Sequence, residues 1–329
     1  MRGTVDTGAA VALHERSLGT IDPIAWDLFV VTSGGSFLGS WKVIRAEGLL
    51  RTVRVFELFS AGTAPVKIGQ CAIAVSRRRV RFLDRLHLLP EHAAVWAEAV
   101  QMVVARCGAA TYAYGSPWNH ECRRVATLAE HSSDRGLVDA GLRLDCVDFA
   151  AWPDFASYRR AVSENIRRDY KKAAAAGPTV VTRRGVAAYR DVPALVGLRK
   201  QVMERNGEPF SSVLDTPKHA LKLLCLRDDA FISTVEARGE RQGAFFGVRF
   251  GDRIYFLSGG TRDRSEGFGS YLFLSLIEGW FSQHPGGKLY LGMTEPGLEP
   301  ATYDRGNLLY RRKLRATSVP GTAFTLDVR

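Results

Sequence analysis

The sequence predicts a mixed α/β fold with two domains in tandem. The chain has 329 residues, which is more than one average domain, and 46% apolar with 10% aromatic residues is enough for packed cores. Residues 253–293 run strand, glycine-bearing loop, helix, strand, an order that requires a crossover between parallel strands. Tight polar turns join the strands before them, so a mixed sheet with antiparallel neighbours is expected.

Composition changes near Trp152-Pro153, and we place the domain boundary there. The sequence thus divides into an N-terminal extension over residues 1–20, a first domain over 21–150 and a second over 151–329.

The first domain is predicted to alternate short strands with helices. Strands are expected at residues 26–32, 51–59, 69–75 and 111–114. Helices are expected at residues 37–46, 90–107 and 116–128, the last with Pro117 in its first turn.

The second domain is predicted to open with a long helix, residues 155–176, that ends at Gly177-Pro178. Further helices are expected at residues 192–205, 216–226, 271–283 and 305–315. Strands are expected at residues 179–183, 231–237, 243–250, 254–257, 289–293 and 323–328.

The helix over 155–176 is strongly basic, with only Glu164 and Asp169 to offset its positive charges: Arg159, Arg160, Arg167, Arg168, Lys171 and Lys172. The four-residue spacing puts Arg167 beside Lys171 and Arg168 beside Lys172, which predicts either a solvated face or a polyanion-binding face. The net charge of +11 also favours a polyanionic partner, although an arginine-rich genome would raise it equally.

Residues 264–269 form an Arg-x-x-Gly-x-Gly pattern at the start of a predicted helix. Free backbone N–H groups at a helix N-terminus favour anionic oxygens, and glycines let a phosphate approach the main chain. An ordinary turn explains the same pattern, so the surrounding order of elements has to decide.

That order resembles the GNAT superfamily of acyltransferases, in which this loop holds the pyrophosphate of coenzyme A. The resemblance covers the second half of the chain and implies cofactor-binding roles for Arg264, Gly267, Phe268, Gly269 and Ser270. It implies acyl-CoA as co-substrate.

The whole chain also resembles the two-domain Fem-type peptidyltransferases and CelD-like acyltransferases. Three segments carry this resemblance: residues 37–41, with Gly39 where glutamine is usual; the basic residues 167–173; and residues 309–313, with Arg312 in place of an aromatic residue. The first domain lacks a matching glycine loop before residue 90. We therefore expect two tandem GNAT-like domains, the first a degenerate partner that shapes the acceptor cleft and the second with the intact cofactor loop.

Both resemblances imply that an amine attacks an activated acyl carbon, which needs a base, charge stabilisation and an acid. The Fem-type resemblance gives Lys313 the charge-stabilising role, and the GNAT resemblance makes Tyr303 or Tyr310 the acid for the leaving group. Glu295, just past the strand at residues 289–293, is the predicted base.

Five dispersed cysteines and seven dispersed histidines predict neither a disulfide framework nor a metal site. Without a signal-peptide pattern or a membrane-length apolar run, we expect a cytoplasmic protein.

Three hypotheses remain. The first is an N-acyltransferase that uses acyl-CoA to acylate a small-molecule, sugar or cell-wall-type amine. The second is a Fem-type transferase with aminoacyl-tRNA as donor, and the third is a non-catalytic RNA- or polyanion-binding protein on the same fold.

Overall fold

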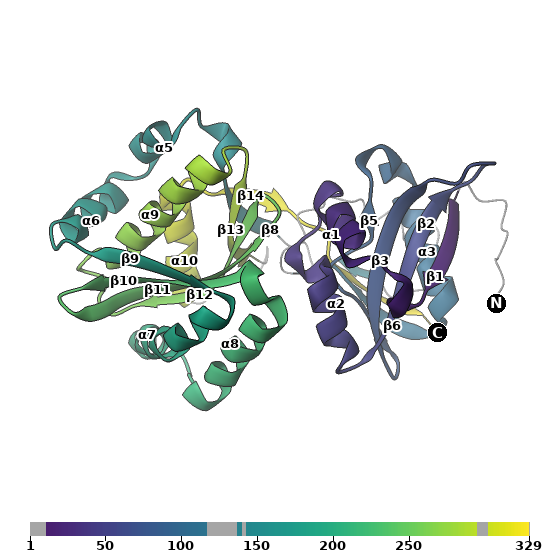
Figure 1. Cartoon of the computed structure of the whole chain (residues 1–329), viewed down its shortest axis with the longest axis horizontal. Coiled ribbons are helices and arrows are strands. Elements are labelled where there is room, and N and C mark those ends of the chain that lie inside the picture. Colours follow the sequence, from purple (N-terminus) through teal and green to yellow (C-terminus); the bar gives the residue numbers. More distant parts are fainter. Residues whose placement is uncertain (1–10, 117–136, 140–142, 295–301, 329) are drawn as a thin grey trace. The chain divides into compact units, whose positions relative to one another are not determined.

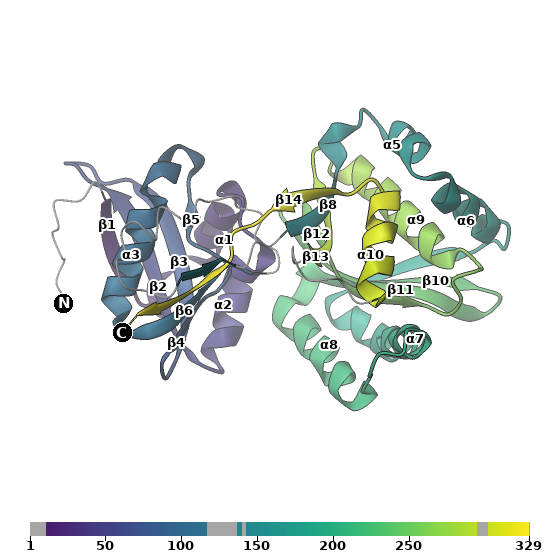
Figure 2. The ribbon, with the colours of Figure 1, turned by 180° about the vertical axis from the view of Figure 1, so that it is seen from behind.

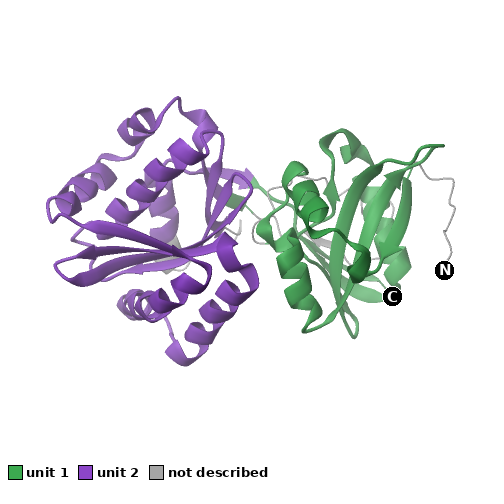
Figure 3. Ribbon diagram, in the orientation of Figure 1, with its two compact units in different colours: residues 1–144, 320–329 green, residues 145–319 purple. Residues whose placement is uncertain are grey.

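The computed structural model describes residues 11–116, 137–139, 143–294 and 302–328. The chain divides into two compact units, residues 1–144 with 320–329 and residues 145–319 (Figure 3). Each unit is built around one mixed sheet. The mixed α/β class expected from the sequence is therefore confirmed.

The first unit has the strand order β1-β2-β3-β4-β6-β15-β7, with β5 paired to β3. Its elements are β1 (Val11–Arg16), α1 (Pro23–Thr32), α2 (Trp41–Gly48), β2 (Thr52–Ser60), β3 (Lys67–Ser76), β4 (Arg79–Phe82), β5 (His87–Leu88), α3 (Trp96–Cys107), β6 (Ala110–Tyr114), β7 (Leu137–Asp139) and β15 (Phe324–Val328).

The second unit has the strand order β14-β8-β13-β12-β11-β10-β9. Its elements are β8 (Arg143–Asp148), α5 (Phe155–Ala161), α6 (Glu164–Ala174), β9 (Thr179–Arg184), α7 (Val192–Arg205), α8 (Ser212–Leu226), β10 (Ala230–Ala237), β11 (Glu240–Phe250), β12 (Arg253–Thr261), α9 (Phe268–Gln283), β13 (Lys288–Thr294), α10 (Thr302–Lys313) and β14 (Thr317–Pro320).

The two sheets repeat one pairing pattern. In the first, β1, β2, β3 and β4 pair antiparallel in sequence and β4 then pairs parallel with β6. In the second, β9, β10, β11 and β12 pair antiparallel and β12 pairs parallel with β13. In both units two helices follow the first strand and one helix precedes the parallel strand. The chain is therefore a structural tandem.

In the second unit, helices cover both faces of the sheet (Figures 1 and 2). Helix α9 packs on β10, β11 and β12 from one side, while α7 and α8 cover the other. Leu272, Ile277 and Trp280 of α9 share a buried cluster with Phe245 and Ile254 of the sheet. This packing fixes the N-terminus of α9 against the sheet.

Residues 26–32 form helix α1, so the strand predicted there is wrong. Asp22 caps the helix by accepting a hydrogen bond from Ile24 N at 2.9 Å, and Pro23 occupies its first turn. The apolar run resembles a strand because hydrophobic side chains lie around much of the helix.

The single helix predicted over 155–176 is interrupted at Val162 and Ser163, whose ψ angles of 145° and 147° are extended. It therefore consists of α5 and α6. The helix predicted at 116–128 lies almost entirely outside the described residues.

Two terminal segments differ from the expected domain division. Residues 11–16 form strand β1, paired with β2 and linked to it by a 2.8 Å ion pair between Arg54 and Glu15, instead of a loose extension. Strand β15, expected in the second domain, lies between β6 and β7 of the first sheet. Its Phe324 ring stacks on Tyr114 at 4.8 Å, a contact that helps to hold the strand in the first sheet.

Candidate active site

The loop before α9 has the conformation that a helix-start anion site requires. Gly267 is the N-cap residue with φ 76°, a left-handed conformation that favours glycine. Helix α9 starts at Phe268, so the N–H groups of Phe268, Gly269 and Ser270 lie in its first turn, without i−4 partners in the helix. The structure thus brings together four of the five residues expected to bind the cofactor.

Arg264, the fifth, is exposed, and its guanidinium donates to Asn206 Oδ1 at the end of α7, at 2.8 Å. Its role in cofactor binding stays a prediction.

Helix α6 crosses this loop. A Cβ atom on Gly267 would lie only 2.3 Å from the backbone oxygen of Asp169. Lys172 Nζ donates to Ser265 O at 2.8 Å, and the rings of Tyr170 and Tyr271 stack at 5.0 Å. The first glycine of the motif is therefore needed for helix packing, whatever ligand the loop holds.

Strands β12 and β13 pair over only three positions, from Arg253–Lys288 to Tyr255–Tyr290, where the two tyrosine rings stack at 5.1 Å. Just beyond, β12 carries a bulge: Gly247 pairs with Phe256 and Phe246 pairs with Ser258, which leaves Leu257 as the extra residue. A bulge redirects the side chains that follow it. Ser258 consequently points to the face covered by α8, where it meets His219.

A buried polar chain lies at this point, and no sequence pattern predicted it. His219 Nε2 lies 2.8 Å from Ser258 Oγ, and His219 Nδ1 lies 2.7 Å from the backbone oxygen of Asp215. Arg199 Nε donates to Asp215 Oδ2 at 2.8 Å. The i, i+4 spacing of Asp215 and His219 was the available signal, but Ser258 is 39 residues away.

Tyr310 comes from α10, and its ring packs edge-on against Phe273 of α9 at 5.6 Å. Its hydroxyl is buried and has no hydrogen-bond partner among the described residues. Burial raises the pKa of Tyr310; the nearby Ser270 hydroxyl lowers it, without reaching hydrogen-bond geometry, and Asp169 raises it further. Tyr310 is thus close to Ser270 of the loop.

Of the other predicted catalytic residues, only Lys313 has a described side chain. The Lys313 side chain is exposed, and its backbone oxygen accepts a 3.1 Å hydrogen bond from Ser163 N. Tyr303 lies in α10, but its side chain is outside the described part of the chain, as is Glu295 entirely. Their roles stay predictions.

The basic residues predicted to bind a polyanion divide into two groups. Arg168, Lys171 and Lys172 are exposed on α6. Arg167 is partly buried, and its Nε has no hydrogen-bond partner among the residues that the structure describes. The exposed group lies beside the loop, because Lys172 donates a hydrogen bond to Ser265 O there.

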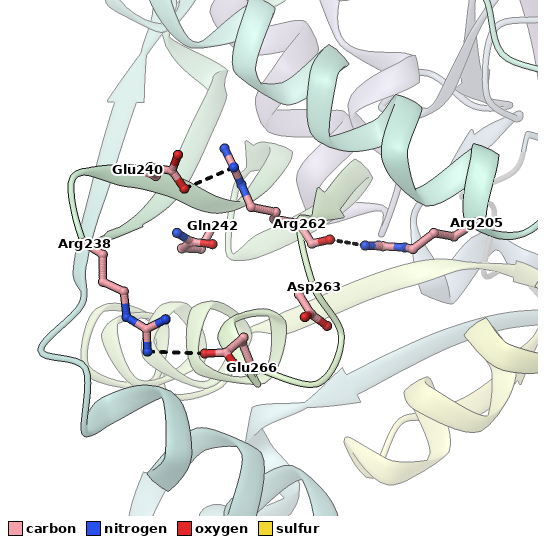
Figure 4. Close-up of a pocket in the computed structure, with 7 residues that line it drawn as sticks. All are labelled: Arg205, Arg238, Glu240, Gln242, Arg262, Asp263 and Glu266. Atoms are coloured by element: carbon pink, nitrogen blue, oxygen red, sulfur yellow. Dashed lines mark hydrogen bonds and ion pairs between the residues drawn. The ribbon is translucent and has the colours of Figure 1, made fainter.

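An open groove of about 580 Å³ lies beside the loop, lined by Arg205, Arg238, Glu240, Gln242, Arg262, Asp263 and Glu266 (Figure 4). Its arginines already have partners. Arg262 pairs with Glu240 at 3.1 Å, Arg238 pairs with Glu266 at 3.5 Å, and Arg205 donates to Thr261 O at 2.7 Å. Three arginines against three acids make this a charge-balanced groove, and a phosphate gains little there.

Residues 159–282 match the family model of the acetyltransferase (GNAT) domain. The chain contains a GNAT domain. The segment matched begins in α5 and ends in α9, so it includes the glycine loop, α6 and the bulge in β12.

Solved structures extend the similarity in fold to the whole chain. The crystal structure of FemX superposes with a TM-score of 0.68 at 10% identity, over 95% of this chain and 96% of that one. A tandem GNAT protein from the clavulanic acid biosynthesis pathway gives a TM-score of 0.54 at 12% identity, over 97% and 98%. L-PGS from Bacillus licheniformis gives 0.54 at 13%, over 93% and 92%. No curated protein sequence matches the chain.

These solved structures share the two-domain fold of this chain, in which residues 159–282 match the GNAT domain. Within the described residues, no cluster of three or more histidine, cysteine, aspartate or glutamate side chains could hold a metal ion. No helix in that part of the chain is both long and apolar enough to cross a membrane.

Proposed function

We propose that this protein is an N-acyltransferase that moves an acyl group from acyl-CoA to a primary amine on a small-molecule, sugar or cell-wall-type acceptor. The observation that carries the proposal is the first turn of α9, where the N–H groups of Phe268, Gly269 and Ser270 lack i−4 partners and the buried Tyr310 hydroxyl is nearby. Such a helix end suits the phosphates of a carrier molecule.

Tyr310 fits the role of proton donor to the leaving group. A phenol is protonated at neutral pH and has a proton to give. Burial raises the pKa of Tyr310 and makes it a weaker acid, so the role rests on its position near Ser270. Lys313 at the end of α10 would stabilise developing negative charge, with Tyr303 and Glu295 as the further acid and base. Arg264 would flank the bound phosphates.

The first unit would serve the acceptor rather than a second donor. The segment between β4 and α3 contains strand β5, which pairs antiparallel with β3. The buried Asp84 in that connection accepts hydrogen bonds from Ser36 N and Ser116 Oγ, both at 2.7 Å. Internal groups thus occupy the position that corresponds to the glycine loop of the second unit.

An aminoacyl-tRNA donor is the second candidate, and one observation favours it. Helix α6 packs directly on Gly267 and presents Arg168, Lys171 and Lys172 to solvent beside the loop. Exposed basic side chains in a row suit a nucleic-acid backbone better than one compact pyrophosphate.

The donor can be tested with two variants at one position. Gly269→Asp puts a carboxylate in the first turn of α9, where it stabilises the helix but repels a phosphate. Gly269→Ala has a similar Cβ contact with Thr261 Cγ2, near 2.9 Å, without the charge. Acetyl-CoA or longer acyl-CoAs should raise the melting temperature of wild type and Gly269→Ala, and this shift should vanish in Gly269→Asp.

Acyl transfer to an amine panel, followed by mass spectrometry, completes the test. A thermal shift with acyl-CoA and a new amide product would support the first candidate. No shift with any CoA, together with transfer from charged tRNA, would support the second. Salt-sensitive RNA binding without transfer from either donor would instead identify a non-catalytic polyanion-binding protein.

A further inference from the structure

The hydrogen bonds around His219 define its tautomer. The backbone oxygen of Asp215 can only accept, so the group 2.7 Å away, His219 Nδ1, must carry a proton and donate it. In the neutral ring, Nε2 is then an acceptor, and Ser258 Oγ at 2.8 Å donates to it. The serine hydroxyl is consequently hydrogen-bonded to an imidazole nitrogen that can take a proton.

Asp215 holds this ring in place from the next turn of α8. Its carboxylate Oδ2 lies 3.7 Å from His219 Nδ1 and accepts from Arg199 Nε at 2.8 Å. His219 is 1% exposed and Ser258 is 6% exposed, so bulk water does not compete for these contacts. A buried polar network is costly unless every group in it is hydrogen-bonded, so packing of the interior alone does not explain why these residues are here.

We propose that Ser258 and His219 form a proton relay that deprotonates the attacking amine of the acceptor. The proposal rests on the N-acyltransferase function proposed above. It assigns the acceptor's proton to this pair of residues instead of to Glu295, and it assigns the acceptor to the face of the sheet covered by α7 and α8.

The position of Ser258 supports this assignment. It directly follows the bulge at Leu257, beyond the last paired position of β12 and β13 at Tyr255 and Tyr290. The donor site at the N-terminus of α9 follows the same strand through the loop at residues 262–267. A donor that reaches from this loop towards the unpaired ends of β12 and β13 would place its acyl carbon beside Ser258.

The relay moves two protons in one direction. As the amine nitrogen forms its bond to the acyl carbon, its N–H proton passes to Ser258 Oγ, and the original hydroxyl proton passes to His219 Nε2. The bond from the acyl carbon to the leaving sulfur or oxygen then breaks, and that atom takes a proton from Tyr310. The imidazolium on His219 faces the Asp215 carboxylate, which stabilises it. After the products leave, the relay runs in reverse: His219 returns its proton to Ser258, Ser258 gives one to a water molecule that replaces the product, and water returns a proton to Tyr310.

The charges around His219 keep it neutral before the reaction. Burial lowers its pKa most, and Arg199 of α7 and Lys222 of α8 lower it further, while the Asp215 carbonyl and carboxylate oppose them. The packed neighbours from the sheet are Phe246 of β11, at a ring distance of 5.3 Å, and Ser258 of β12. The relay is therefore ready to accept a proton at neutral pH.

The test uses the full-length protein with the donor and amine identified by the transfer screen. Ser258→Ala removes the bridging hydroxyl, and His219→Gln keeps a hydrogen-bond acceptor but cannot take the proton. Each should lower kcat by about 100-fold or more, with donor KM within about twofold. The double variant should lose little more than either single one, because the two residues act as a unit.

The pH profile separates a relay from a purely structural contact. Wild-type kcat should fall on the acid side as His219 becomes protonated, and His219→Gln should lose this acid limb. Ser233→Ala is the matched control, since it removes another buried hydroxyl whose hydrogen bond to Thr182 Oγ1 is also 2.8 Å long. The control should keep both the rate and the acid limb.

Several results would overturn the relay. Transfer by Ser258→Ala at more than half the wild-type kcat would do so, as would an unchanged acid limb in His219→Gln. An acyl group trapped on Ser258 would show nucleophilic catalysis instead. Each of these leaves acyl transfer itself intact, whereas a wild-type protein inactive with every donor would overturn the proposed function and the relay together.

Discussion

At the scale of single residues, two features of the structure around Gly267 disfavour every other amino acid. Its φ of 76° is unfavourable for a residue with a Cβ, and that atom would lie 2.3 Å from Asp169 O. Gly267→Ala should therefore lower the free energy of unfolding by about 2–4 kcal/mol, from backbone strain and displacement of α6. Urea denaturation followed by circular dichroism measures this.

Gly279, in the middle of the same helix, is the matched control. A Cβ there has no neighbour within 4 Å, and its φ is ordinary. Gly279→Ala should stabilise the protein by about 0.5–1 kcal/mol, because alanine favours the helix. If both alanine variants gave the same change, the close approach of α6 to Gly267 would be wrong.

Lys222 gives a pH-dependent prediction. Burial lowers its pKa to about 8, with Lys218 and Arg199 acting in the same direction. Between this value and its ordinary value near 10.5, the unfolded chain binds more protons than the folded one, so the stability contribution of this residue rises with pH. Below pH 8 the folded state bears the cost of a partly buried charge.

Lys222→Gln should thus raise the free energy of unfolding at pH 7 by about 1–2 kcal/mol, a value reduced from the full shift because the side chain is partly exposed. The difference from wild type should disappear as the pH passes 10. Lys171→Gln, at an exposed position on α6 away from Lys222, should show neither effect. A constant difference from pH 7 to 10.5 would contradict the assignment.

At the scale of elements, α6 is the one whose surface predicts a partner. Arg168, Lys171 and Lys172 are exposed together beside the loop. Replacing all three by glutamine should weaken binding of tRNA and reduce the slope of log K against log salt by about 2–3, one counterion for each charge removed. Fluorescence anisotropy over a salt series measures both quantities.

The control for the α6 variant removes the same number of positive charges from another part of the surface. Arg77, Arg78 and Arg79 are exposed at the turn between β3 and β4, and their glutamine variants also remove three positive charges. If tRNA binding depended on net charge alone, the two triple variants would lose affinity equally. A selective loss in the α6 variant would support a defined binding face.

Elements with a clear amphipathic period or strong turn signals could be predicted from the sequence. Helix α7, the antiparallel strands β10, β11 and β12, and the crossover through α9 follow their residue patterns closely. Helix α1 could not, because its apolar residues hide the helical period and only Asp22-Pro23 marks its start. The break between α5 and α6 depends on packing that no local pattern reveals.

The candidate site was predictable only where its residues are contiguous. The loop with Gly267, Phe268 and Gly269 is one segment, and its helix-start geometry follows from its glycines. The contact of α6 with Gly267 and the chain from Ser258 to His219 join residues far apart in sequence. The bulge at Leu257 also reverses the alternation of side chains along β12. A prediction of which face of the sheet Ser258 lies on would depend on that alternation.

At the scale of the whole molecule, the chain ends in the unit in which it begins. Strand β15 lies between β6 and β7, with Phe324 against Tyr114 at 4.8 Å and edge-on to Trp96 at 6.1 Å. An inserted central strand contributes hydrogen bonds on both of its edges and closes the core of the first unit. The stability of that unit therefore depends on residues that follow the entire second unit in sequence.

Phe324→Ala should lower the free energy of unfolding of the first unit by about 3–5 kcal/mol, the cost of a cavity at a buried aromatic residue. Hydrogen exchange followed by mass spectrometry should show faster exchange in peptides from β2 and β3, with peptides from β10 and β11 unchanged. Thr325→Ala, at the exposed neighbouring position, should leave both sets as in wild type. Equal loss of protection in both sheets would mean that the two units unfold as one, and that the division of the chain at residues 144 and 320 has no energetic counterpart.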